Sequence, residues 1–293
     1  MAMSAFMQFL ETTLNPLILV FTLSNLAAMG LQVKVPDLLA AFQNKKALVL
    51  IFVWGWILGP AFGFLITKIL PLDEPYVIVV LLTSLAPCAP FLQQMVGKAN
   101  GDVGFAGALI PLVALGTVVF MPLMAPILIK GLTISAWALA KPLLLTILLP
   151  LTIGAAIRHY ADQRATRIFP AVKGLALIST LLTVIWCLTL YGKSMLNTAG
   201  EFALLAMTIF MVGIAIITYL FGFGLKQNQR SVMSLGMGTR NIAAVFAAAL
   251  AIPNADPRIM VMVIMWTLWS VVLAAIAARV FLKQSLAELA SQK

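Results

Sequence analysis

The sequence predicts an all-α, polytopic membrane protein, and three observations lead to that prediction. Hydrophobic residues make up 62% of the 293 residues and charged residues 10%, with a mean hydropathy of +1.07, whereas a soluble domain carries roughly 25% charged residues. Apolar runs of about 20 residues, enough for a helix to cross a hydrocarbon core of roughly 30 Å, recur along the whole chain. None of them alternates with the period of two that barrel strands require, which leaves helices.

Polar residues, glycines and prolines divide the chain into about nine transmembrane helices within a single domain, residues 1–293. The longest connection, residues 158–171, is expected to be a solvated loop that is too short to fold alone. One structural repeat is expected over about 14–129 and a second over about 136–282. The expected spans are residues 14–33, 47–69, 77–97, 103–129, 136–157, 171–192, 202–225, 232–252 and 259–282.

The distribution of Lys and Arg predicts the orientation. With nine spans the termini lie on opposite sides of the bilayer, and thirteen of the nineteen basic residues fall in connections on the side of the C-terminus, against five on the other side. Cytoplasmic loops collect positive charge, so the N-terminus is expected outside and the C-terminus in the cytoplasm, in a plasma or inner membrane. The net charge of +10 is spread singly between apolar runs, which indicates a lipid bilayer as partner and no nucleic acid.

The third expected span contains an interruption. Its sequence reads SLAPCAPFLQQMVGKANGD, with Pro87 and Pro90 in mid-span and Gln93 and Gln94 shortly after them. A proline removes a backbone donor and its ring collides with the preceding turn, so the helix is expected to break near Pro87 to Pro90. A kink that serves only packing is the alternative for this span taken alone.

The eighth expected span contains a second interruption, with the sequence GMGTRN. Gly236 and Gly238 supply backbone flexibility at the predicted break. Thr239, Arg240 and Asn241 then place three polar side chains where the neighbouring residues are apolar.

Two broken, polar spans lying five spans apart fit an inverted repeat in which discontinuous helices cross near the bilayer midplane. Non-helical backbone at that depth is tolerated only inside protein or beside a water-filled cavity, so the breaks predict a solute site. The positive N-terminal ends of half-helices, with Arg240, suit a small-molecule organic anion. Asn25 in the first span is a further candidate, although such residues also mediate helix packing. The predicted substrate-binding residues are Arg240, Asn241, Thr239, Gln93, Gln94, Pro90 and Asn25.

The charge of Arg240 needs a partner, since burying an arginine in a membrane costs about 2.5 to 3.5 kcal/mol on insertion scales. None of the nine acidic residues lies in the middle of an expected span. The expected partners are therefore carbonyl groups at half-helix ends, Gln93, Gln94 or an anionic substrate. A purely structural arginine held by carbonyl groups is the alternative to a substrate-binding one.

The chain resembles the bile acid:sodium symporter family, also called the BASS family, over nearly its whole length. The stretch LSNLAAMGLQV resembles the family's glycine-bearing early helix, and Pro60 falls in the next helix. The stretches PCAPFLQQMVGKANGDV and GMGTRN resemble its two crossing helices. The resemblance implies a core domain that contains the crossing helices, a panel domain, and substrate in the crevice between them. Family members with ten spans have one more helix before the early one, which is not found in this chain.

The second crossing motif departs from the family pattern, which reads Glu-x-Gly-x-Gln-Asn. Gly238 and Asn241 match it, whereas Gly236 stands at the family's sodium-binding glutamate and Arg240 at its glutamine. By the resemblance, Asn241 would lie beside the substrate crevice.

The first crossing motif and the helix after it also lack the family's ligands for sodium. Leu92 and Gln93 stand at the family's Ser-Asn pair, and Ala106 and Ile110 at its hydroxyl ligands. The chain therefore resembles a divergent family member that lacks most of the side chains that bind sodium.

These observations predict a secondary transporter that moves an organic anion by alternating access, without sodium coupling through the usual family site. The alternative is a sodium-coupled symporter of bile-acid-like or small carboxylate solutes, in which sodium would be the bound ion. Primary pumping is disfavoured, because the sequence contains no GxxxxGK[ST] motif for ATP.

Functions of other classes fit the sequence less well. An enzyme is not expected, because the only histidine is His159 in a predicted connection and no Asp or Glu lies in mid-span. A metal site is not expected either, since Cys88 and Cys187 form no Cys/His cluster. A channel would need a pore ring or filter, and a membrane scaffold would not need two broken polar helices.

Overall fold

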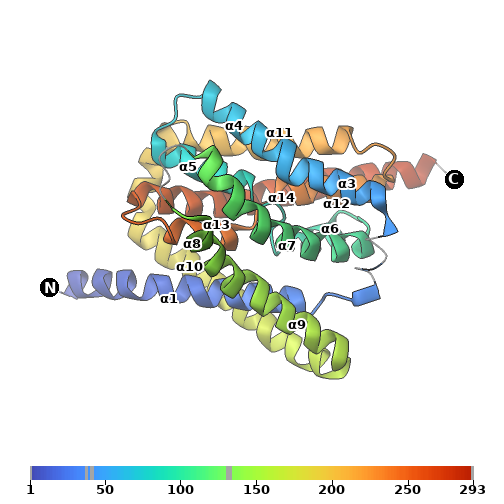
Figure 1. The fold of residues 1–293 in the computed structure, drawn as a ribbon, viewed down its shortest axis with the longest axis horizontal. Helices are drawn as coiled ribbons and strands as arrows, with labels where there is room; N and C mark the ends of the chain where they lie inside the picture. The colour runs from blue at the N-terminus through green and yellow to red at the C-terminus, as the bar shows by residue number, and fades with distance from the viewer. Residues whose placement is uncertain (1, 37–38, 40–42, 130–133, 292–293) are drawn as a thin grey trace.

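The structure, a computed structural model, describes residues 2–36, 39, 43–129 and 134–291, and these residues fold almost entirely into helices (Figure 1). Within these described ranges, seven helices are long and apolar enough to cross a membrane. The polytopic, all-helical architecture is thus confirmed, while the count of nine spans remains a prediction. The elements are α1 (Ala2–Gly30), α3 (Lys45–Phe52), η1 (Val53–Leu58), α4 (Gly59–Ile69), α5 (Glu74–Ser84), α6 (Leu92–Lys98), α7 (Val103–Leu128), α8 (Ala136–Leu143), η2 (Leu144–Leu148), α9 (Leu149–Tyr160), α10 (Asp162–Gly200), α11 (Ala203–Leu220), α12 (Gln227–Gly238), α13 (Ile242–Leu250) and α14 (Pro257–Ser291).

Two of the membrane-length helices contain a π-helical segment, η1 between α3 and α4 and η2 between α8 and α9. Each π segment is followed within two residues by a proline, Pro60 or Pro150, in the first turn of the next α-helix. Proline lacks the N–H group that an α-helical bond would use, so the helix changes its hydrogen-bonding register there and continues.

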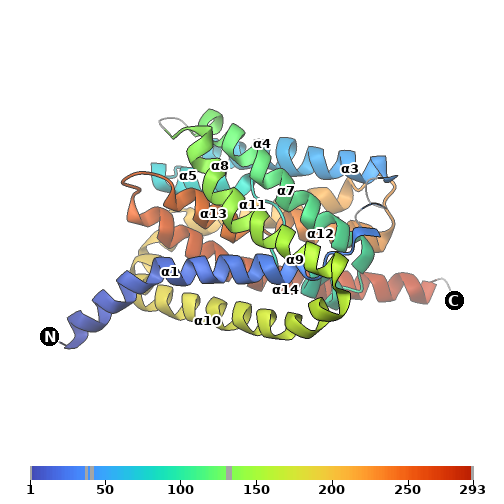
Figure 2. The same ribbon diagram turned by 60° about the horizontal axis from the view of Figure 1, so that its bottom comes forward.

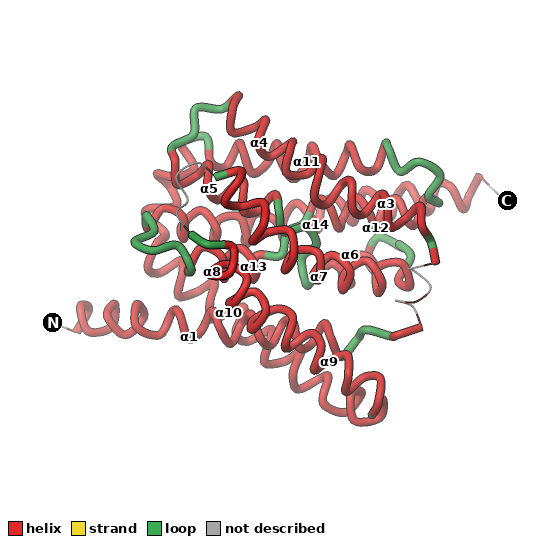
Figure 3. The backbone as a smooth tube through the Cα atoms, viewed as in Figure 1, coloured by secondary structure: helices red, strands yellow, loops and turns green. Residues whose placement is uncertain are grey.

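Two further helices are interrupted completely. The α-helix α5 ends at Ser84 and α6 begins at Leu92, while α12 ends at Gly238 and α13 begins at Ile242. Non-helical backbone therefore lies in the interior of the molecule as well as at its ends (Figure 3). These two helix pairs occupy the third and eighth spans that the sequence predicts.

The helices α1, α9 and α10 pack against one another along one side of the molecule, and we call them the three-helix group (Figure 2). Glycines allow α1 and α9 to approach closely: a Cβ atom added to Gly30 would lie 2.3 Å from the carbonyl oxygen of Leu151. One added to Gly154 would lie 2.7 Å from that of Ala27. Small residues are typical of helix crossings in lipid. The hydrophobic effect does not drive helices together there, and close packing of the backbones stabilises their association instead.

The remaining helices surround the two interrupted pairs. Large apolar side chains such as Phe210, Phe246 and Trp266 are fully buried among them. The two chain termini lie at opposite ends of the molecule (Figure 1).

The expected solvated loop over residues 158–171 is wrong. The α-helix α9 continues to Tyr160 and α10 begins at Asp162. Arg158 and Asp162 form an ion pair of 3.1 Å between Nε and Oδ1 across the turn. The polar residues of this segment extend α9 and α10 beyond their apolar parts. They can do so because a helix end that leaves the other helices is exposed and needs no apolar face.

Candidate functional site

The two helix breaks meet in the middle of the fold. Pro87 and Arg240 form an isolated antiparallel bridge. The backbone N–H of Cys88 donates to the carbonyl oxygens of Gly236 and Thr239, each at 3.0 Å, and the N–H of Asn241 donates to the carbonyl oxygen of Ala86 at 2.8 Å. Backbone groups that the interrupted helices leave without partners thus bond across the crossing, which satisfies them in a region from which water is excluded.

Side chains of the second break complete this arrangement. The hydroxyl of Thr239 accepts a hydrogen bond of 3.2 Å from the N–H of Ala89 and donates one of 2.7 Å to the carbonyl oxygen of Leu235. The side-chain oxygen of Asn241 accepts from the N–H of Ala244 at 3.3 Å and so caps the N-terminus of α13. Both residues therefore hold the break in shape.

Arg240 is completely buried at the crossing. Its Nη1 donates to the carbonyl oxygen of Ser84 at 3.4 Å, and its Nη2 donates to that of Met237 at 2.6 Å. Ser84 is the last residue of α5 and Met237 lies in the last turn of α12. The guanidinium carbon also lies 4.5 Å from the ring centroid of Phe210 on α11, a cation–π distance.

This geometry shows how the charge of Arg240 is balanced. Among the described residues no carboxylate forms an ion pair with it. Instead the guanidinium lies at the C-terminal ends of α5 and α12, where aligned peptide dipoles leave partial negative charge. Hydrogen bonds to a charged group contribute about 1.5 to 3 kcal/mol each, so two of them offset a burial cost of about 2.5 to 3.5 kcal/mol. The Nε atom has no hydrogen-bond partner among the described residues.

The predicted site residues of the first break lie where the non-helical segment after α5 leads into α6. Pro90 is half-buried, and Gln93 and Gln94, in the first turn of α6, are half-buried and exposed respectively. The hydrogen bonds of Arg240 described above go to carbonyl oxygens and not to either glutamine. In this conformation the contacts of Arg240 correspond to the alternative interpretation of the sequence, a structural arginine held by carbonyl groups.

Gly236 and Gly238, which the sequence places at the break itself, lie in the last turn of α12, just before the break. Close packing accounts for glycine at both positions. A Cβ atom at Gly236 would lie 2.9 Å from Cys88 Sγ and from Leu109 Cδ2, and one at Gly238 would lie 2.9 Å from Ala215 Cβ. The residues that leave the helical path are those from Thr239 to Asn241.

Asn25 lies away from the crossing, within the three-helix group. Its side-chain amide donates to the carbonyl oxygen of Phe21 at 2.8 Å and to the hydroxyl of Thr180 at 3.3 Å. The hydroxyls of Ser24 and Ser179 lie 3.2 Å apart beside them. These bonds join α1 to α10, so in this conformation Asn25 serves the helix packing that the sequence left as its alternative.

The seam between the three-helix group and the other helices is closed. Phe21 and Thr183 line it from α1 and α10, and Phe246 and Thr267 line it from α13 and α14. The cavity that remains there measures about 10 Å³, roughly the space of one water molecule. At this point the seam has no room for an organic solute.

Sequence reasoning missed two residues of the crossing. Phe210 comes from a different helix, and nothing in its local sequence marks it as a partner of an arginine. Cys88, considered in the sequence only as a metal ligand, has a left-handed backbone with φ of 65° and donates its N–H to the carbonyl oxygen of Gly236 in α12. The two flanking prolines were the available signal for an unusual backbone at this position.

The described part of the chain contains no group of three or more His, Cys, Asp or Glu side chains placed to hold a metal ion. Any ion held at the crossing would therefore depend on carbonyl, hydroxyl and amide oxygens. Two of these carbonyl oxygens, those of Ser84 and Met237, are already bonded to Arg240.

Comparison with known families and proteins gives a consistent picture. Residues 16–198, more than half of the chain, match the Sodium Bile acid symporter family. The chain is 24% identical over 227 residues to the probable sodium/metabolite cotransporter BASS3, chloroplastic, of Arabidopsis thaliana, covering 76% of this chain and 53% of that protein. It is 23% identical over 193 residues to the protein of the same name from Oryza sativa subsp. japonica, covering 66% and 46%.

The chain thus spans about half the length of the curated relatives it matches. The family match agrees with the helical membrane architecture and with the two interrupted helices at its centre. The chain therefore belongs to the Sodium Bile acid symporter family and is an integral membrane protein.

Proposed function

We propose that this chain is a secondary transporter of an organic anion that works by alternating access without binding sodium at the crossing. The observation that supports this most directly is the pair of hydrogen bonds from Arg240 to the carbonyl oxygens of Ser84 and Met237. Carbonyl oxygens are the kind of ligand that a hard cation selects, and here a permanent cation of the protein already uses them.

Electrostatics oppose a second cation at the same place. Two unit charges about 4 Å apart repel by about 4 kcal/mol at an effective dielectric constant of 20, which is close to a thousandfold in affinity. The glutamate that would attract sodium in the resembling motif is replaced by Gly236, which is packed against Cys88 and Leu109. A low sodium affinity follows from both features.

Alternating access is supported by the closed seam between the three-helix group and the other helices. Its lining combines aromatic side chains with the hydroxyls of Thr180, Thr183 and Thr267. Gln93 lies in the first turn of α6, after the first break, and Asn241 caps α13 at the second break. With Thr239, Gln94 and Pro90, they are the residues that we propose for contact with the solute when the seam opens. Arg240 contributes its positive field from within the protein.

Uptake into proteoliposomes tests this proposal. A thermal-shift screen of bile acids and short monocarboxylates and dicarboxylates identifies a solute, and its uptake is then measured with an inward gradient of sodium chloride or of choline chloride. We expect equal initial rates, with saturation and counterflow as for a carrier. A several-fold higher rate in sodium would refute sodium independence and would favour the second candidate, a sodium-coupled symporter, which the names of the relatives support.

A further inference from the structure

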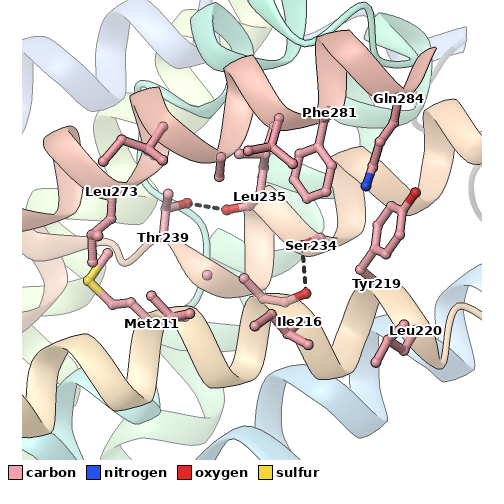
Figure 4. Close-up of a pocket in the computed structure, with 17 residues that line it drawn as sticks. Met211, Ile216, Tyr219, Leu220, Ser234, Leu235, Thr239, Leu273, Phe281 and Gln284 are labelled. Carbon is pink, nitrogen blue, oxygen red and sulfur yellow. Dashed lines mark hydrogen bonds between the residues drawn. The ribbon is translucent and has the colours of Figure 1, made fainter. Parts of the chain in front are cut away.

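A second cavity lies on the outer side of the helices α11, α12 and α14, away from the seam that the transport proposal uses. It is a groove of about 290 Å³, near the lower end of the range for ligand pockets. Figure 4 shows Met211 and Leu273 towards one end and Tyr219 and Gln284 at the other. The groove is long, apolar along most of its length, and polar at one end.

The walls of the groove face outward. The side chains of Ile216 and Leu220 on α11 are 53% and 64% exposed, and those of Ile276 and Val280 on α14 are 54% and 47% exposed. In a protein that spans a membrane, apolar side chains exposed on a transmembrane helix contact lipid tails and not water. The groove is therefore accessible from the hydrocarbon region of the bilayer.

The interior of the groove offers no unpaired hydroxyl donor. Ser234 donates its hydroxyl hydrogen to the carbonyl oxygen of Ala215 at 2.6 Å, and Thr239 donates its own to that of Leu235 at 2.7 Å (Figure 4). An occupant of this part of the groove thus gains dispersion contacts and no hydrogen bonds from these side chains. A hydrocarbon chain meets that condition, whereas a polar solute would lose its hydration without replacement.

The polar end of the groove carries groups that suit an anion. The hydroxyl of Tyr219 donates to the side-chain oxygen of Gln227 at 2.7 Å, at the first residue of α12. No side chain caps the N-terminus of α12, and its positive dipole end favours a nearby anion. Glu288 lines a cavity with Lys226 and Gln227 at this end. Residues 226–230 and 279–288 contain four basic residues and one acidic residue, Glu288. Lys283 is exposed and lies one helical turn beyond Val280, which lines the groove.

We propose that this groove binds an acyl chain of an anionic membrane phospholipid, with the phosphate headgroup beside the N-terminus of α12 and Lys283. The apolar interior takes the chain, the lateral opening admits it from the bilayer, and the basic end selects the headgroup. The groove shares Thr239 with the proposed solute contacts, but its other lining residues are not among them, and the proposal does not depend on the mode of transport.

The position of the groove connects this lipid to the crossing. Gly238 and Thr239 form part of its floor, and the carbonyl oxygen of Thr239 accepts the N–H of Cys88 across the two breaks. An acyl chain in the groove therefore packs directly against the residues where α12 ends. Contacts with the bound acyl chain stabilise the native geometry of the break. A short detergent chain makes fewer of these contacts and stabilises it less.

Photolabelling tests the proposal. The full chain is reconstituted in nanodiscs that contain phosphatidylglycerol with a diazirine in mid-acyl chain, and the labelled peptides are mapped. We expect label concentrated in α11 and α14 in the native chain. Ala277→Trp, which fills the groove from α14, should reduce that label to the level found on the outer face of α10. Val272→Trp, on the same helix at a 46% exposed position outside the groove, should leave it unchanged.

The headgroup is tested separately and requires no bulky substitution. Lys283→Gln should lower labelling by phosphatidylglycerol about fivefold at limiting lipid, the effect of removing one basic residue near a bilayer surface. The matched control Lys173→Gln, on exposed α10, should not. Label spread evenly over all outward helices, equal labelling by phosphatidylcholine and phosphatidylglycerol, or displacement of the label by taurocholate would each overturn the proposal, since these outcomes indicate general lipid contact or a solute site.

Discussion

Replacing Arg240 with methionine removes the charge and keeps a long apolar stem at the crossing. The variant loses two charge-assisted hydrogen bonds, to the carbonyl oxygens of Ser84 and Met237, which contribute about 1.5 to 3 kcal/mol each. It also loses the contact with the ring of Phe210, which contributes about 0.5 to 2 kcal/mol. Against this, it avoids the insertion cost of arginine, about 2.5 to 3.5 kcal/mol.

The net expectation is a loss of ~2 kcal/mol in the free energy of unfolding. For a chain of this size, that corresponds to a fall in Tm of several degrees. Thermal unfolding in a mild detergent, followed by intrinsic fluorescence, measures it. Arg258→Met is the matched control, because Arg258 is 42% exposed and its partners are Asp73 and Asp256 at the surface, where ion pairs contribute little to stability.

Sodium provides the sharper readout. In the native chain, sodium chloride and choline chloride at equal ionic strength should give the same Tm. In Arg240→Gln the carbonyl oxygens of Ser84 and Met237 lose their resident cation, so sodium should raise the Tm above the value in choline. A native protein that sodium stabilises by several degrees, or an Arg240→Met variant as stable as the native chain, would refute the reasoning.

Three other outcomes are expected. Single cysteines at Ala5 and Ala290, both exposed near the chain ends, should react with impermeant maleimide from opposite sides of intact cells; labelling from one side would contradict the odd number of spans. Asn241→Ala should cost about 1 kcal/mol of stability through its lost cap and weaken solute binding in a thermal-shift titration, whereas unchanged binding would remove it from the site. Hydrogen bonds from Arg258 lower the pKa of Asp256, so this pair should stabilise the fold above about pH 4 and lose its effect as pH falls further; Asp256→Asn should narrow that difference, and an unchanged pH profile would exclude the pair.

The break in the third span was predictable because proline acts locally. A residue without an N–H group cannot donate the bond of an α-helical turn, and Pro87 lies within the non-helical segment between α5 and α6. Pro60 shows the limit of the same rule. It lies in a helix that continues past it with a π-helical segment before it, because the register of a helix can change at a proline without breaking.

The sequence limits the candidate hydrogen-bond partners of Arg240 but does not identify the carbonyl groups that bind it. The absence of acids in mid-span left carbonyl groups, glutamines or a substrate, and every residue has a carbonyl group. Which carbonyl oxygens turn toward the guanidinium depends on where α5 and α12 end in space. Phe210, on a third helix, follows from the packing of α11 and from no local pattern.

The ends of the helices could not be predicted from the sequence either. The sequence predicts the apolar part of α10 well, since lipid contact demands it, but the helix runs from Asp162 to Gly200 and includes polar turns on both sides. Asn25 illustrates a different limit. An amide in a membrane helix must find a partner, and the partner that it found, Thr180, belongs to the adjacent helix and not to a solute.

A cation that is part of the polypeptide cannot be released on either side of the membrane. On the proposed mechanism, Arg240 therefore returns with the empty carrier in every cycle, and no ion gradient is consumed. Net movement of a monovalent anion then carries one negative charge across the bilayer, with a free energy of about 2.3 kcal/mol per 100 mV. At such a potential, negative inside, the solute would distribute about fiftyfold in favour of the outside. The membrane voltage would set the direction of net flow, and a one-for-one exchange of like anions would be insensitive to it.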